Sequence, residues 1–83
     1  MPNFYIADIV DHNIVVHGNI SDIKRGDIIT TIDSEGKKHA EIFIKTRSML
    51  GETVMYTLGA IVDEETQAER VVEHFYVVEQ YVL

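Results

Sequence analysis

The sequence predicts one all-β domain over residues 1–83, a small, six-stranded, closed or partly open antiparallel β-barrel. Short segments rich in β-branched and aromatic residues recur along the chain, and clusters of turn-forming residues separate them. No linker, internal repeat or low-complexity stretch divides the chain. Because closure removes exposed strand edges, a barrel is the economical arrangement for a domain of this size.

The first half of the chain contains three expected strands, at residues 3–10, 13–20 and 27–33. The short polar side chains at residues 11–13 bond their own backbone readily and therefore predict a turn. Residues 21–25 are expected to form a tight connection. The second strand is supported by three consecutive β-branched residues that begin at Ile14.

The middle of the chain adds a fourth expected strand at residues 38–45 and a fifth at residues 53–62. A turn at residues 34–37 precedes the fourth strand, with a glycine available for a positive φ angle. Residues 46–51 are expected to be irregular or to form a single helical turn. Residues 63–69 are expected to form an acidic loop or one helical turn.

Residues 70–82 fit two interpretations. Apolar residues fall at helical spacing from Ala68 to Val82, and Asp63 is able to cap such a helix. The segment is nevertheless rich in valine and aromatic residues, and this favours a long strand. Both faces of that strand are then partly apolar, which indicates that something else covers its end. One face carries Val71, Phe75, Val77 and Tyr81, and the other carries Val72, Tyr76, Val78 and Val82.

Four sequence blocks occur in the order of a known family. They are Phe4-x-Ile6-x-Asp8-Ile9, Ile14-Val15-Val16-x-Gly18-x-Ile20, Ile23-Lys24-x-Gly26-Asp27-x-Ile29, and Gly51-Glu52-Thr53-Val54 with the strand that follows. Together they resemble the second domain of translational GTPases of the elongation factor Tu class. The resemblance covers about residues 4–62 and implies a small β-barrel. In the full-length factors this barrel packs on a GTPase domain and helps hold the aminoacyl end of tRNA.

Four residues in these blocks are expected to shape turns and bends. Gly18 permits a close backbone approach or a sharp bend in mid-strand. Gly26 and Asp27 turn the chain into the next strand, with the Asp27 carboxylate able to bond turn amides. Gly51 is expected to end the irregular segment before the fifth strand.

The formal net charge is −7, and it is concentrated in the second half of the chain. Residues 1–49 hold seven acidic and six basic residues, whereas residues 50–83 hold seven acidic residues and one basic residue, Arg70. Because phosphate backbones repel an acidic surface, the charge disfavours a nucleic-acid partner. It favours a protein partner with a basic surface.

The sequence also bears on compartment and chemistry. With no cysteine, no basic and apolar leader and no long apolar run, it predicts a cytoplasmic protein without a membrane-spanning helix. No Gly-x-x-x-x-Gly-Lys-Ser/Thr loop is present for nucleotide phosphates. His12, His17, His39 and His74 have no recognisable ligand spacing, although a hairpin at residues 11–13 would bring the first two near each other. No metal, cofactor or catalytic residue is therefore expected.

These observations predict a non-catalytic protein-binding module, for example a small acidic inhibitor or immunity-type protein. Two alternatives remain open. One is an accessory factor of translation or of RNA–protein assembly, which the family resemblance suggests. The other is a homo-oligomeric structural barrel that pairs with itself through its last strand. The residues expected to contact a partner are Tyr76, Tyr81, Glu73, Glu79, Glu64 and Glu65.

Overall fold

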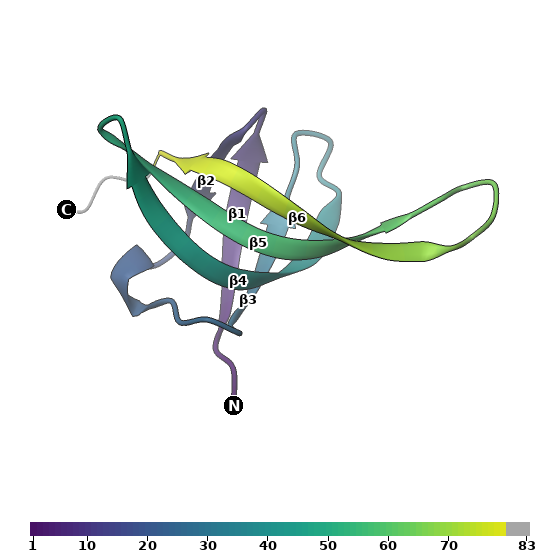
Figure 1. Cartoon of the computed structure of the whole chain (residues 1–83), viewed down its shortest axis with the longest axis horizontal. Coiled ribbons are helices and arrows are strands. Elements are labelled where there is room, and N and C mark those ends of the chain that lie inside the picture. The colour runs from purple at the N-terminus through teal and green to yellow at the C-terminus, as the bar shows by residue number, and fades with distance from the viewer. Residues whose placement is uncertain (80–83) are drawn as a thin grey trace.

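A computed structural model describes residues 1–79 of the chain. Six strands curve into a closed ring with the order β1-β2-β6-β5-β4-β3 (Figure 1). The all-β barrel expected from the sequence is therefore confirmed. The elements are β1 (Phe4–Val10), β2 (Asn13–Val16), a 3-10 turn η1 (Ile20–Asp22), β3 (Ile28–Ile32), β4 (Lys38–Met49), β5 (Glu52–Val62) and β6 (Glu69–Val78).

The ring is not antiparallel throughout. Four of its pairings are antiparallel, but β1 pairs with β3 and β2 pairs with β6 in parallel. The cause of the first parallel pairing is the connection between β2 and β3, which contains η1 and returns the chain to the start of β1. Ile28 then donates its amide to the carbonyl of Asn3, and β3 runs alongside β1 in the same direction.

The interior of the ring holds a compact apolar core. Its side chains come from alternate residues of the strands and from the segment after η1, as the two-residue period of a pleated strand requires. Tyr5, Ile9, Ile20, Tyr76 and Val78 pack against this core. The core residues are Ala7, Ile14, Val16, Ile23, Ile29, Phe43 and Met55.

Two segments differ from the sequence-based expectation. The expectation that residues 46–51 are irregular or form a single helical turn is wrong. β4 continues to Met49 and reaches β5 through a two-residue turn. Leu50 and Gly51 form this turn with φ angles of 50° and 82°. Two consecutive positive φ angles are typical of the tight hairpin turn that matches the twist of its strands. The second strand ends at Val16 rather than at residue 20, where η1 begins.

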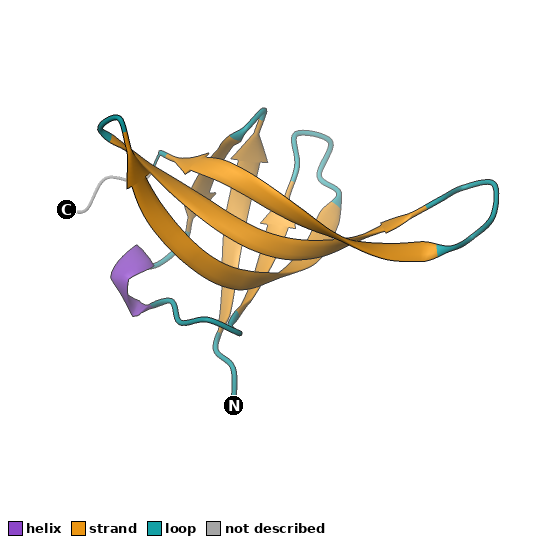
Figure 2. Ribbon diagram, viewed as in Figure 1, coloured by secondary structure: helices purple, strands orange, loops and turns teal. Residues whose placement is uncertain are grey.

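The β5–β6 hairpin extends beyond the ring as a twisted two-stranded arm (Figures 1 and 2). The pairs Ile61↔Arg70 and Val62↔Glu69 continue the ladder into this arm, and a loop at residues 63–68 closes it. The carboxylate of Asp63 accepts the amides of Glu65 and Thr66 and so fixes the start of the loop. The strand interpretation of residues 70–82 is confirmed as far as Val78, where β6 ends, and residues 80–82 lie outside the described residues. The acidic loop is confirmed at the tip of the arm.

Candidate functional site

The two faces of β6 differ sharply in their surroundings. Its even-numbered residues face the barrel interior, where the pairs Met55↔Tyr76 and Thr57↔His74 place them beside buried positions of β5. Its odd-numbered residues face outward, and Val71 and Phe75 are 71% and 60% exposed. The division of apolar residues between two faces, expected from the sequence, therefore corresponds to an inner face and an outer face.

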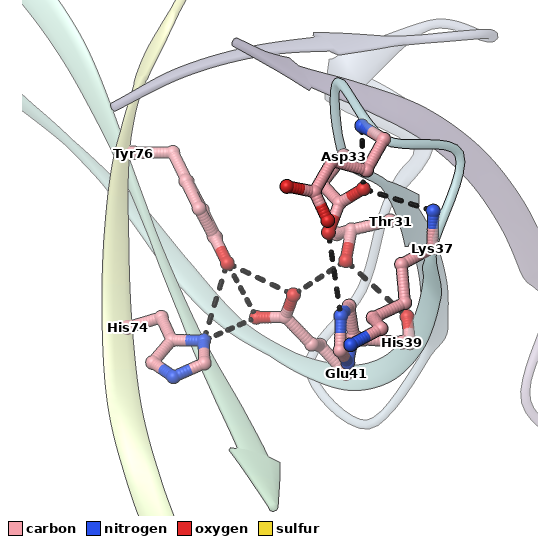
Figure 3. Close-up of polar contacts among 8 residues, drawn as sticks. Thr31, Asp33, Lys37, His39, Glu41, His74 and Tyr76 are labelled. Atoms are coloured by element: carbon pink, nitrogen blue, oxygen red, sulfur yellow. Dashed lines mark hydrogen bonds and ion pairs between the residues drawn. The ribbon is translucent and has the colours of Figure 1, made fainter. Parts of the chain in front are cut away.

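The inner face of β6 meets a carboxylate buried in the barrel wall. Glu41 on β4 is 2% exposed, yet its side chain contacts polar groups from three other strands. Figure 3 shows its contacts with Thr31, His74 and Tyr76. The hydroxyls of Thr57 and Thr31 donate hydrogen bonds to the Glu41 carboxylate, with oxygen–oxygen distances of 2.5 and 2.8 Å. The hydroxyl of Tyr76 lies 2.9 Å from both carboxylate oxygens, and Nδ1 of His74 lies 2.9 Å from one of them. We call Glu41 and these four partners the Glu41 cluster.

Electrostatics in the Glu41 cluster favour the ionised carboxylate. Burial raises the pKa of Glu41, but hydrogen bonds from Thr57, Thr31, Tyr76 and His74 together outweigh burial and hold this pKa below its ordinary value. Burial raises the pKa of Tyr76, and the negative charge of Glu41 and the hydrogen bond donated to it raise that pKa further. The cluster therefore consists of a charged acceptor surrounded by neutral hydroxyls and one imidazole.

Close packing fixes the geometry of the Glu41 cluster. A Cβ atom added to Gly59 on β5 would lie 3.2 Å from Cε1 of His74 and 3.3 Å from Cγ of Glu41. Glycine at this position therefore leaves room for the two side chains to meet. Because four donors are directed at one carboxylate, the arrangement satisfies a buried charge and ties β3, β4, β5 and β6 together.

The cluster lies behind a surface hollow of about 300 Å³, which is lined by His12, Glu73, His74, Phe75 and Tyr76. The side chain of His74 is 30% exposed, so the polar interior reaches solvent here. The hollow adjoins the turn between β1 and β2 on one side and β6 on the other.

Aromatic side chains form a row along the outer surface beside this hollow. The ring of Phe75 stacks on that of His12, with centroids 6.5 Å apart and an interplanar angle of 11°. On its other side Phe75 contacts Tyr56 of β5, again at a centroid distance of 6.5 Å. Nζ of Lys45 lies 5.4 Å from the centroid of the Tyr56 ring, in the range of a cation–π interaction. Phe75 and His12 are exposed in this row and Tyr56 is half-buried, and the exposed acidic residue Glu73 lies on the same face of β6 as Phe75.

The seam between β2 and β6 closes the ring over a short length. Within residues 1–79, β2 pairs with β6 only at Asn13↔Val77 and Ile14↔Val78. Val77 donates its amide to the carbonyl of His12, and Glu79 donates to the carbonyl of Ile14. On the side away from β5, the rest of β6 from Glu69 to Tyr76 has no strand partner in the described chain.

The residues expected to contact a partner do not gather in one place. Tyr76 points into the barrel and bonds Glu41, whereas Glu73 is exposed on the outer face of β6. Glu79 follows the end of β6, while Glu64 and Glu65 lie at the far end of the arm (Figure 1). Tyr81 lies outside the described residues.

Three of the four expected turn residues, Gly18, Gly26 and Gly51, occupy bends or turns, and Asp27 directly follows a turn. Gly18 lies in a bend after the end of β2, so its expected place in mid-strand is wrong. Gly18 and Gly26 have φ angles of 153° and 95°, and the ring of Tyr5 packs closely over Gly18. Asp27 accepts the amides of Asn3 and Lys24 at 3.0 and 2.9 Å. The hydrogen bonds from the Lys24 and Asn3 amides lower the pKa of Asp27.

Other polar side chains provide no further site. Among residues 1–79, no group of three or more histidine and carboxylate side chains is arranged to hold a metal ion. His17 pairs with Asp8 at 2.7 Å, and His39 lies 3.8 Å from Asp33.

No helix in the described part of the chain has the length and apolarity needed to cross a membrane.

Sequence reasoning missed the two residues that organise this region, Glu41 and Phe75. Phe75 was placed on an apolar strand face but was not singled out, because its exposure depends on which face turns inward. A weak signal for Glu41 did exist: Thr31 and Thr57 occupy apolar strands, where buried hydroxyls need a polar partner.

Comparison with protein-family models, with curated proteins and with solved structures finds no match for this chain. The interpretation of the site therefore rests on its geometry.

Proposed function

We propose that this chain is a non-catalytic protein-binding module that contacts its partner through the outer face of β6. We define this face by Val71, Glu73 and Phe75. The observation that carries the proposal is the exposure of Val71 and Phe75, 71% and 60%, beside the aromatic row. Large apolar side chains gathered on a surface indicate a contact with another molecule.

Charge supports a protein partner with a basic surface. Glu69, Glu73 and Glu79 lie on or next to β6, and none of them forms an ion pair within residues 1–79. An apolar centre with a charged rim is the usual composition of a protein interface. The same acidic side chains would repel a phosphate backbone. A small acidic inhibitor of a basic protein is one form that this function would take.

A second apolar surface provides an internal comparison. Phe4 on β1 is 74% exposed, and Ile6 on β1 and Ile42 on β4 are 52% and 43% exposed. Phe4 thus resembles Phe75 in residue type and exposure, but it lacks a neighbouring acidic residue on its own strand until Asp8. The two phenylalanines make a matched pair for testing which surface binds.

The test is site-specific photo-crosslinking in cells that produce the protein. A benzophenone amino acid replaces Phe75 in one variant and Phe4 in the other, and mass spectrometry identifies the captured proteins. We expect a discrete partner captured from position 75 and not from position 4. Binding should then be reproduced with the two purified proteins and weakened by Phe75→Ser.

Three outcomes would overturn the proposal. The first is equal capture from both positions, and the second is capture from neither. The third is capture of a second copy of the chain, with a matching dimer mass by light scattering, which would favour the homo-oligomeric barrel.

A further inference from the structure

We infer that the free edge of β6 accepts an extended, basic segment of the partner as an additional strand. This inference rests on the proposed function and specifies how the partner is held. The edge consists of the backbone groups of Val71, Glu73 and Phe75 that point away from β5. It adjoins the hollow between β6 and the turn that joins β1 to β2.

The direction of these backbone groups follows from the seam. Val77 and Glu79 donate their amides away from β5, to the carbonyls of His12 and Ile14. Because backbone groups alternate in direction along a strand, the amides and carbonyls of Val71, Glu73 and Phe75 point the same way. The described part of the chain contains no β-ladder partner for them on that side.

The position of this edge suits an incoming strand. β2 already occupies the same side of β6 at Val77 and Val78, so a segment laid against Val71 to Phe75 would extend an existing ladder. Exposed edges of this kind bind extended peptides through main-chain hydrogen bonds, with side chains providing selectivity. The hollow beside His74 and Tyr76 offers space for the side chains that face inward.

The charges near this edge favour a basic segment. The exposed part of β6 carries two acidic residues, Glu69 and Glu73, and one basic residue, Arg70. Asp11 lies in the adjoining turn between β1 and β2. A segment with alternating basic and apolar residues would place its basic side chains beside Glu73. A second copy of the chain fits poorly. If two β6 edges paired antiparallel about a two-fold axis at Glu73, the Glu73 carboxylates of the two copies would face each other. If the axis lay at Val72, Val71 of each copy would face Glu73 of the other.

The first experiment uses the full chain, labelled with ¹⁵N, and the peptide acetyl-Lys-Val-Lys-Val-Lys-Val-Lys-amide. In the free protein, the amides of Val71, Glu73 and Phe75 should exchange rapidly, and those of Val72, His74 and Tyr76 should exchange slowly. Bound peptide should protect the first set. The matched control peptide has glutamate in place of lysine and should not bind.

N-methylation of the peptide tests the backbone bonds directly. One version of the peptide carries a methyl group on the backbone nitrogen of every lysine, and the other carries one on the backbone nitrogen of every valine. Each version therefore blocks one edge of the extended peptide. One version should bind about tenfold or more weakly than the parent peptide, because several hydrogen bonds are lost, and the other should retain binding. Equal binding of both versions would show that side chains alone hold the peptide and would overturn the inference.

A protein variant provides the complementary test. Glu73→Pro removes one outward amide without removing a bond to β5, and proline is tolerated at such edge positions. It should weaken peptide binding more than Glu73→Ala does. Folding of both variants is checked by circular dichroism, and if Glu73→Pro does not fold, the N-methylated peptides decide the question.

The remaining outcomes separate the two proposals. Capture of a partner from position 75, with no protection of the three amides and no peptide binding, would overturn strand addition and leave the proposed function intact. Protection of the three amides in the free protein, with a dimer mass, would show that a second copy fills the edge and would overturn this inference.

Discussion

The inner and outer faces of β6 carry similar residue types but have opposite surroundings. On the inner face, His74 and Tyr76 direct polar atoms at a buried carboxylate. On the outer face, Phe75 stacks on His12 and contacts Tyr56 at the surface, and Glu73 is exposed. One strand thus separates residues that hold the barrel together from residues that are available to a partner. The comparison predicts that stability depends on the inner face and binding on the outer face.

Removing the buried carboxylate should destabilise the barrel more than any other single change considered below. Glu41→Ala leaves four polar groups in the barrel wall without their acceptor, and we expect it to lower the free energy of unfolding by about 3 kcal/mol or more, because each buried donor without a partner costs about 1–3 kcal/mol. Urea denaturation measures this change. His39→Ala, on the exposed part of the same strand, should change stability by no more than about 0.5 kcal/mol. Equal losses in the two variants would contradict the assigned role of the Glu41 cluster.

Acid should reproduce part of this loss. The pKa of Glu41 in the folded protein lies below its ordinary value of 4.5, so its ionised form stabilises the fold above that pH. This contribution should disappear as the pH falls through the lower, folded-state pKa. Urea denaturation at several pH values should therefore show a steeper acid decline for the natural chain than for Glu41→Gln. Asp27 and Asp33 also have lowered pKa values, and comparing the two proteins cancels their contributions.

The next effect concerns neighbouring residues on opposite faces. Tyr76→Phe removes a hydroxyl bonded to both oxygens of Glu41, and we expect a loss of about 1.5–3 kcal/mol. Phe75→Leu keeps an apolar side chain at the surface and should cost less than about 1 kcal/mol. Thermal and urea unfolding of both variants checks the order. A larger loss for Phe75→Leu would reverse the assignment of the two faces.

The strand pattern of this region was readable from the sequence, but its buried charge was not. Alternation along residues 70–82 is a local, two-residue period, and it separated the two faces of β6 correctly for the described residues. The partners of Glu41, by contrast, are 10 to 35 positions away in the sequence. They meet because β3, β4, β5 and β6 pair side by side in the curved sheet, and a local pattern along one strand does not encode that pairing.

The same limit explains the other differences. The sequence of β4 shows Ile42 and Ile44 on one face and Glu41 and Phe43 on the other, and composition alone favours burying the isoleucines. The structure instead turns Glu41 and Phe43 inward and leaves Ile42 43% exposed. A register shift between Phe43 and Lys45 follows, as expected where a strand bends around a barrel. The carboxylate of Glu41 can face the barrel interior because four donors from other strands form hydrogen bonds with it.

Removing a charge from the outer face of β6 should alter binding while leaving stability almost unchanged. Glu73 is exposed on the outer face and forms no ion pair within residues 1–79, so Glu73→Gln should change the free energy of unfolding by no more than about 0.5 kcal/mol. It should nevertheless weaken binding of the basic peptide and reduce the dependence of that binding on salt, because one attractive charge is lost. Isothermal titration calorimetry at two salt concentrations measures both the affinity and its salt dependence.

The double variant Glu73→Gln with Glu41→Gln tests whether the two faces are independent. Its loss in the free energy of unfolding should equal the sum of the two single losses to within about 0.5 kcal/mol, since the two carboxylates share no hydrogen-bond partner. A larger coupling energy would mean that the outer face also supports the barrel, and that β6 does not separate stability from binding.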